Sequence, residues 1–447
     1  MTRWRRMADA DVIVVGGGLA GLASALELQR LGRSVVLLEQ STQLGGKANS
    51  TRTAAGLFPD GPTSFNGRAA PFWRLLALLG LEDEVSKLSP VSSARYLVRD
   101  GRLRGLKPNP LSVLSTRAFS WNDKVAALRE YTQRSTHAVT GDESLQALLE
   151  RRFGRDMVEH VFAAVLTGVF AGDLNALSAA SCFPALLDAE SKHGGVIRAL
   201  LAAPKSGRAG TFTFRNGFSV IGQRAAQKLP HRLGVNVERI EFDRGGVRVD
   251  SLRAAAVVVA TEPHVAAKLL QPVLPRVAAE LAQFDMAPLS LVQWSERTPG
   301  ESRLPRGFGY LAAPIEALFA LGTLFVGDLL DEAPRRFSTF IGGALQRARA
   351  QRSDEELIAG ARADLTKLTG GKMGDVQRVV RWPHAVFQPK VGHRAALARI
   401  RSELSSRPIA LAGGYCGAAA MKDALAAGFA AAELVDGQLP RRLEVAS

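Results

Sequence analysis

The stretch DVIVVGGGLAGLASALELQRLGRSVVLLEQ, residues 11–40, decides the fold of this 447-residue chain. Residues 11–15 are rich in β-branched side chains, a pattern typical of a buried parallel strand. Gly16, Gly18 and Gly21 follow in G-x-G-x-x-G spacing, and the sequence then becomes helical. A second apolar strand, residues 35–38, ends on Glu39. Strand, glycine turn, helix, strand and terminal acid together predict a dinucleotide-binding unit.

Each part of this motif has a physical task in dinucleotide binding. Gly16 permits the tight turn, Gly18 lets the backbone approach a diphosphate, and Gly21 lets the helix pack closely on the strand. The amide groups at the helix N-terminus can donate hydrogen bonds to phosphate oxygens. Glu39 is placed to accept hydrogen bonds from a ribose diol.

A second glycine pair distinguishes between the candidate dinucleotides. LGGKANS, residues 44–50, follows Glu39 closely and is a familiar continuation in flavoproteins, whereas a plain nicotinamide dehydrogenase has no use for it. The chain has two cysteines, Cys182 and Cys416, and no C-x-x-x-x-C pair, which excludes a disulfide reductase. The sequence therefore predicts FAD as the cofactor.

A late glycine-rich unit is consistent with this prediction. Residues 409–434 form a strand pattern, a Gly413-Gly414 turn and a helix of small residues. The N-terminus of that helix could stabilise negative charge on the pyrimidine end of a reduced flavin. An ordinary β–α unit packed against the sheet remains the alternative.

Composition bounds the class of protein. A chain of this length favours two or three domains. The net charge of +15 indicates a polyanionic substrate, a membrane surface or a coding bias toward arginine, because no nucleic-acid-binding module is visible. The longest uncharged runs, near 161–172 and 409–421, are too short to span a membrane. We expect a cytosolic protein, with peripheral contact with the inner membrane face left open.

The element pattern predicts an α/β fold built around a discontinuous Rossmann-type FAD-binding domain. Its three segments are residues 1–70, 211–262 and 376–447, and within the second segment a strand at VNVERI is expected to pass the adenine. A helical insertion, which could face a membrane, is expected over 71–205. An α+β insertion over 263–375 is expected to bind the substrate, because the insertions rather than the nucleotide domain choose it.

Beyond the glycine motifs, the chain resembles the protoporphyrinogen/coproporphyrinogen oxidase family of the FAD-dependent amine oxidase superfamily. The resemblance covers nearly the whole chain. The segments that carry it, in order, are LGGKANS (44–50), GPTSF (61–65), LTGVFAGDLNALS (166–178), RGFGYL (306–311), LGTLF (321–325), FSTFIGGA (337–344) and PHAVFQPKVGH (383–393).

The resemblance implies two sets of site residues. Those expected to bind FAD are Gly16, Gly17, Gly18, Leu19, Ala20, Gly21, Glu39, Gln40, Gly46, Lys47, Gly61, Pro62, Thr63, Ser64, Val237, Trp382, Gly414, Ala419, Ala420 and Met421. Those expected to bind substrate are Arg95 toward a propionate, Leu311, Leu324 and Phe340 around the macrocycle, and Gly168, Ala171 and Gly172 against its edge.

The resemblance also implies the activity: oxidation of protoporphyrinogen IX or coproporphyrinogen III to the porphyrin. Six electrons leave in three flavin cycles, and oxygen reoxidises the flavin and is released as hydrogen peroxide after its reduction. The partners expected are an anionic tetrapyrrole and oxygen, without nucleic acid, and a homodimer is left open. No catalytic base is required, since the cofactor supplies the chemistry. None of the seven histidines has metal-ligand or triad spacing, so no metal is predicted.

Two other functions remain open. One is an oxidase or desaturase of the same superfamily that acts on an amine or a polyene, although an amine would favour an acidic or aromatic cage. The other is a flavin-binding scaffold without turnover, because VGDLLDEAP (326–334) and GGYCGAAAMKDAL (413–425) depart from the family's pattern.

Overall fold

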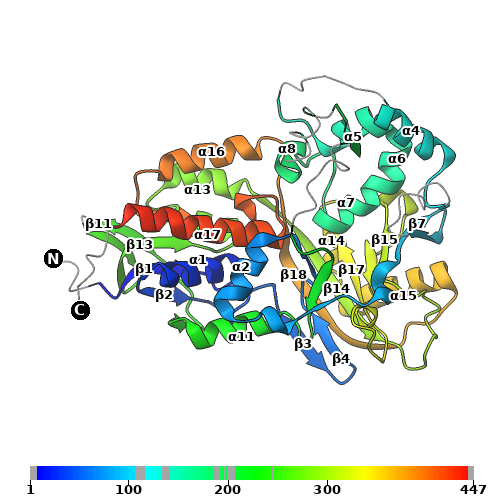
Figure 1. Cartoon of the computed structure of the whole chain (residues 1–447), viewed down its shortest axis with the longest axis horizontal. Coiled ribbons are helices and arrows are strands. Elements are labelled where there is room, and N and C mark those ends of the chain that lie inside the picture. Colours follow the sequence, from blue (N-terminus) through cyan, green and yellow to red (C-terminus); the bar gives the residue numbers. More distant parts are fainter. Residues whose placement is uncertain are drawn as a thin grey trace.

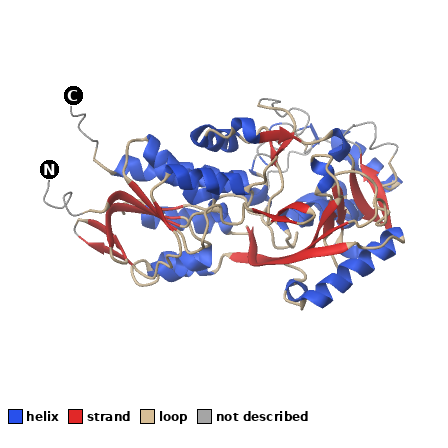
Figure 2. Ribbon diagram, turned by 90° about the horizontal axis from the view of Figure 1, so that it is seen from below, coloured by secondary structure: helices blue, strands red, loops and turns tan. Residues whose placement is uncertain are grey.

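Two seven-stranded sheets lie side by side along the long axis of the molecule in the computed structural model (Figures 1 and 2). The fold is mixed α/β, as the sequence predicted. The structure describes residues 8–106, 116–132, 141–184, 187, 192, 194, 195, 197, 198, 207–243 and 245–440. Parts of the expected helical insertion, 107–115, 133–140 and most of 185–206, lie outside the described residues.

The first sheet begins with the motif that opens the chain. Its strand order is β10 (His231–Arg232), β2 (Val35–Leu38), β1 (Ala10–Val15), β13 (Leu252–Val259), β12 (Gly246–Val249) and β11 (Ile240–Asp243), and β19 (Ile409–Leu411) also pairs with β13. Strand β1 is parallel to both β2 and β13. The carboxyl ends of these central strands therefore meet at one edge, where open α/β sheets bind ligands.

Successive side chains of β1 point to opposite faces of the sheet and contribute to two apolar cores. Val12 and Val14 face a core shared with α1 (Leu19–Arg30), α2 (Ala70–Leu79), α11 (Ser219–Lys228) and α17 (Met421–Gln438). Ile13 and Val15 face a second core with α12 (Pro263–Leu270), α13 (Pro275–Ala282) and α16 (His393–Leu404). A sheet covered on both faces explains why β2, β19 and residues 12–15 of β1 are apolar without interruption.

The second sheet is mostly antiparallel. Its order is β18 (Asp375–Gln388), β14 (Asp285–Ser295), β17 (Arg336–Gly342), β16 (Gly322–Leu324), β15 (Gly309–Ala312), β7 (Arg95–Arg99) and β8 (Arg102–Leu106). One face packs on α15 (Asp354–Thr369) through Phe337, Trp294 and Leu365. Short helix α14 (Arg347–Ala350) packs beside β14 and β17.

A group of helices covers part of the other face of this sheet (Figure 1). It comprises α4 (Trp121–Thr132), α5 (Leu145–Phe153), α6 (Arg155–Met157), the π-helical turn Val158–Phe162, α7 (Ala163–Phe170) and α8 (Ala179–Cys182). The other strands of the described residues form two smaller sheets: β3 (Ser50–Thr53) with β4 (Gly56–Pro59), and β5 (Phe65–Asn66), β9 (Thr211–Phe214) and β6 (Val85–Lys87). The described helices include none that combines the length and apolar character required to cross a bilayer.

Three details differ from the expected organisation. Strand β18 lies in the second sheet, beside β14, and not with the segment 376–447 in which we expected it. Strands β7 and β8, within the expected helical segment, also join the second sheet because β7 pairs with β15. The strand expected at VNVERI begins only at Ile240; residues 235–239 have no regular structure. Strand partners distant in sequence, which periodicity does not register, account for the first two differences.

Candidate active site

The glycine turn is held by contacts that leave no room for a side chain. A Cβ atom on Gly21 would lie 1.8 Å from the carbonyl oxygen of Gly16, and one on Gly16 would lie 2.7 Å from that of Ala260. Gly16 has φ of +105°, a conformation that favours glycine. A Cβ on Gly18, by contrast, would meet nothing within 4 Å. The turn is therefore tightly packed on the protein side and open at Gly18.

A cavity of about 750 Å³ opens beside Gly18, where the two sheets meet. Its walls come from the turn and from the segments after β2, β13 and β19, with Met286, Trp382 and Phe387 contributed by the second sheet. This volume lies within the range of small-molecule and cofactor sites.

Glu39 is positioned at this cavity by backbone donors. The Gly17 amide donates to Glu39 Oε2 at 2.6 Å, and the Ser41 amide donates to Oε1 at 2.8 Å. The carboxylate is thus fixed at the end of β2 and has capacity left to accept from a ribose diol.

The second glycine pair, Gly45-Gly46, packs against the glycine turn at residues 16–18. Gly45 forms a parallel bridge with Gly18, and its amide donates to the Gly17 carbonyl at 2.8 Å. Lys47 then reaches into the cavity wall, where its ammonium lies 2.6 Å from Glu262 Oε1 and donates to the Ala385 carbonyl at 3.1 Å. The loop therefore runs along the turn, as LGGKANS indicated.

Most of the residues expected to bind FAD lie in the lining of this one cavity. They are Gly16, Gly18, Leu19, Ala20, Glu39, Gln40, Gly46, Lys47, Pro62, Val237, Trp382, Gly414, Ala419, Ala420 and Met421. The other five, Gly17, Gly21, Gly61, Thr63 and Ser64, are outside this lining. A Cβ on Gly61 would lie 2.6 Å from the carbonyl oxygen of Lys47, and Thr63 lines a separate, smaller cavity. Their individual roles in binding remain predictions.

Several lining residues were missed from the sequence. Glu262 and His264 follow β13, and Tyr415 follows β19. A usable signal existed for Glu262, since ligands bind beyond the carboxyl ends of parallel strands. Tyr415 is 2% exposed, and its hydroxyl has no hydrogen-bond partner among the described residues. Burial raises the pKa of Tyr415, so this hydroxyl keeps its proton.

The residues expected to contact substrate share one face of the second sheet. Strand pairing places Leu311 opposite Gly322, which lies opposite Phe340. Arg95 and Leu324 both lie opposite Gly309, two positions before Leu311. Because side chains alternate between faces, these registers put Arg95, Leu311, Leu324 and Phe340 on the same face.

Helix α7 packs on this face of the second sheet. A Cβ on Gly168 would lie 2.5 Å from a δ-methyl of Leu311, and one on Gly172 would lie 2.7 Å from Gln388 Oε1. Ala171 ends the helix with φ of +47° and packs with Leu291 and Phe340. The three residues expected at the substrate's edge are therefore brought to the same face as the four above.

Arg95 is the cationic residue of this group. Its guanidinium lies 4.7 Å from the ring centre of Phe308, over the apolar cluster that includes Leu324 and Phe340. Desolvation by the surrounding protein lowers the pKa of Arg95, although the residue is exposed. Within the described residues no carboxylate pairs with Arg95, which leaves its forked donors available to an anion.

Comparison with known proteins identifies the family. The model of flavin-containing amine oxidoreductases matches residues 19–436. The chain belongs to this family. It is a flavin-containing oxidoreductase, and its cofactor is FAD, as the glycine motifs predicted. The residues present fit that cofactor, because the turn leaves open space only at Gly18, beside a cavity with Glu39 on its wall.

Curated relatives match nearly full length at low identity. The chain is 29% identical to protoporphyrinogen oxidase of Homo sapiens, over 96% of this chain and 99% of the relative. It is 26% identical to protoporphyrinogen oxidase 2, chloroplastic/mitochondrial, of Arabidopsis thaliana, over 80% of each chain. It is 27% identical to coproporphyrinogen III oxidase of Propionibacterium freudenreichii, over 97% of this chain and 92% of the relative.

Solved structures share the fold. A chain from Exiguobacterium sp. described as a protoporphyrinogen oxidase superposes with a TM-score of 0.81 at 20% identity, covering 97% of this chain and all of that one. Cyclohexylamine oxidase from Brevibacterium oxydans superposes with a TM-score of 0.72 at 20% identity, covering 97% of this chain and 100% of that one. Both likenesses show a shared fold, and the fold alone does not distinguish between substrate classes.

Proposed function

We propose that the protein oxidises a porphyrinogen, protoporphyrinogen IX or coproporphyrinogen III, to the porphyrin in tetrapyrrole biosynthesis. Six electrons would leave in three flavin cycles, and three molecules of oxygen would become three of hydrogen peroxide. The observation that carries the proposal is Arg95, a cation that has no carboxylate partner among the described residues, beside the apolar face that holds Leu311, Leu324 and Phe340. The curated relatives named above support the same substrate class.

The chemistry of the substrate matches this face. A porphyrinogen has a large apolar ring system and carboxylate arms, so it needs apolar walls with a few cationic anchors. Arg95 can bind one propionate through paired N–H donors, which fixes the orientation of the ring. An amine substrate would place a second cation near Arg95, which is unfavourable.

The protein's own residues would bind, orient and exclude water. Leu324, 8% exposed, and Phe340 would hold the ring against the sheet, while α7 would cover its edge through Gly168. When bound, FAD supplies the oxidising chemistry by accepting hydride equivalents and passing electrons to oxygen. No side-chain base is assigned: buried His393 is engaged by the Tyr415 carbonyl at 2.8 Å and the Ser181 hydroxyl at 3.3 Å.

The domain arrangement is part of the proposal. A FAD-binding unit would combine segments from 1–70, 211–262 and the part of 376–447 that follows β18, and the second sheet would form the substrate unit. The strand pairings of β1 with β13, and of β13 with β19, support the first grouping. The pairings of β14 with β18 and of β7 with β15 support the second.

Side-by-side turnover tests the activity. The purified yellow protein would be mixed in air with protoporphyrinogen or coproporphyrinogen, and porphyrin fluorescence and peroxide would be followed against an enzyme-free control. We expect fluorescence to grow with three peroxides per porphyrin, and flavin absorbance to bleach when oxygen is removed. The proposal fails if both porphyrinogens leave the flavin oxidised under anaerobic conditions. Bleaching by amines alone would assign the amine class instead.

Peripheral membrane contact is the last element proposed. Trp121 (77% exposed), Val125, Leu128 and Tyr131 form an apolar stripe along one side of α4. With a net charge of +15, this stripe suits an anionic lipid surface. Co-sedimentation with vesicles of anionic phospholipid should fall when Trp121 and Leu128 are both changed to Ser. Equal sedimentation of the wild type and the double variant would contradict membrane contact through α4.

A further inference from the structure

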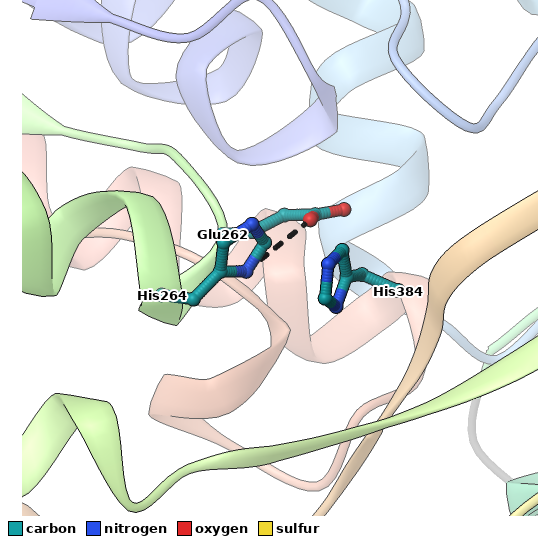
Figure 3. Close-up of side chains that lie close together, drawn as sticks. All are labelled: Glu262, His264 and His384. Carbon is teal, nitrogen blue, oxygen red and sulfur yellow. Dashed lines mark ion pairs between the residues drawn. The ribbon is translucent and has the colours of Figure 1, made fainter.

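Three potential metal ligands meet beside the cofactor cavity, and two of them, Glu262 and His264, belong to its lining. Glu262 precedes α12, His264 lies in the first turn of that helix, and His384 comes from β18 of the other sheet (Figure 3). Their ligand atoms all lie within 4.8 Å of one another. Glu262 Oε2 is 3.7 Å from His264 Nδ1, and the two imidazole rings have centres 4.0 Å apart.

This spacing is close to that of a transition-metal site. Zinc binds histidine nitrogen and carboxylate oxygen at roughly 2.0–2.2 Å in tetrahedral geometry, so neighbouring ligand atoms are about 3.4 Å apart. The observed separation of 3.7 Å between carboxylate and imidazole exceeds this by only a few tenths of an ångström. The other ligand atoms lie within 4.8 Å of one another, so His384 has to approach by at most about 1.4 Å to reach this spacing. Both histidines are exposed, so their side chains can move this far without disturbing a core.

We propose that Glu262, His264 and His384 bind one divalent transition-metal ion, with Zn²⁺ the best match to two imidazoles and one carboxylate. Three protein ligands leave a fourth position for water or for an oxygen of a molecule in the cavity. Because Glu262 and His264 line the cavity, the ion would lie at its wall. This assignment does not depend on which substrate the enzyme oxidises.

Lys47 is the group that opposes this ion. Its ammonium is 2.6 Å from Glu262 Oε1 and also donates to the carbonyls of His384 and Ala385. It therefore neutralises one carboxylate oxygen and leaves Oε2 facing His264. A neighbouring cation disfavours a second positive charge, so removing the ammonium should strengthen metal binding. If the three side chains do not bind a metal ion, removing the Lys47 ammonium should not change metal affinity.

Calorimetric titration of the purified, flavin-containing full chain with Zn²⁺, after treatment with a chelator, tests the site. We expect one ion per chain. His264→Ala and His384→Ala should each weaken binding by at least about tenfold, since changes even outside the ligand shell of metal sites commonly cost that much. Lys47→Met, compared at equal flavin content, should strengthen binding several-fold.

His160→Ala is the matched control, because His160 Nδ1 lies 3.2 Å from Asp156 Oδ1 and the described residues supply no third ligand there. Its Zn²⁺ affinity should equal that of the wild type. Unchanged thermal unfolding of the two histidine variants without metal would show that they fold. The proposal is overturned if the wild type takes up no Zn²⁺, or if both histidine variants bind it as tightly as the wild type does.

Discussion

The glycine turn and the substrate face are both closely packed, but against different partners. At the turn, the space beside Gly21 is occupied by the Gly16 carbonyl, and backbone cannot rotate away. At the substrate face, the space beside Gly168 is occupied by a δ-methyl of Leu311, which can rotate. The difference indicates that the glycine turn is fixed by backbone, whereas the proposed substrate side is shaped by side chains, so we expect it to tolerate change better.

The largest effect is expected at the turn. Gly21→Ala places a methyl group 1.8 Å from the Gly16 carbonyl oxygen, so β1 and α1 must separate. Overpacking commonly costs about 1–3 kcal/mol, and we expect at least the upper end here, together with loss of flavin. Denaturant unfolding and flavin absorbance per chain measure both. Gly437→Ala, where a Cβ meets nothing within 4 Å, should retain full flavin; equal behaviour of the two variants would contradict the packing argument.

Substrate affinity is expected to depend on Arg95. A hydrogen bond to a charged group contributes about 1.5–3 kcal/mol, so Arg95→Ala should raise KM for a propionate-bearing porphyrinogen by about tenfold or more while flavin content stays intact. Arg95→Lys should recover part of the loss, because it keeps the charge but not the fork. Arg102→Ala, on the adjacent strand of the same hairpin, serves as control. An unchanged KM in Arg95→Ala would contradict the proposed role of Arg95 in substrate binding.

A smaller effect should follow crowding at the substrate face. Gly168→Ala pushes against a movable side chain, so we expect a stability loss below that of Gly21→Ala, full flavin content and a KM raised a few-fold. Adding Leu311→Ala should relieve the contact and restore the stability lost through Gly168→Ala. If the two changes are simply additive, Gly168 and Leu311 do not act on one another.

The smallest effect concerns acid stability near the cavity. Burial lowers the pKa of His393, with the Tyr415 carbonyl and Asp142 acting in the opposite direction and Arg401 acting with burial. A carbonyl can only accept, so Nε2 carries the hydrogen of the neutral ring.

Because the folded pKa is the lower one, the unfolded chain binds the proton first. The free energy of unfolding should therefore fall as pH drops below about 6.5, the ordinary histidine value, toward the folded pKa. In His393→Gln the slope over this interval should be shallower. Parallel stability profiles for the two proteins would show that His393 does not contribute.

Local motifs made the cofactor side predictable. Residues 11–40 carry their strand, turn, helix and acid in one run, and β1, α1 and β2 follow it closely. The helix at 421–438 was likewise predictable, because a strand pattern and a glycine pair precede a run of small residues there. The prediction of a strand at VNVERI was wrong. Residues 235–239 run beside the cavity without a partner strand, and local β-propensity does not show whether a partner is present.

The sequence by itself determined the dinucleotide turn, because Gly16 and Gly21, which pack on one another, are five positions apart. It also indicated the flavin and the enzyme family, because their motifs are short local segments that can be read without the fold. Only the tertiary structure decided that β18 and β7 join the second sheet, and that Arg95 shares a face with Leu311, Leu324 and Phe340. It also brought His384 to Glu262 and His264. The physical reason is strand register: a pairing between distant segments fixes which side chains meet, and no local spacing encodes it.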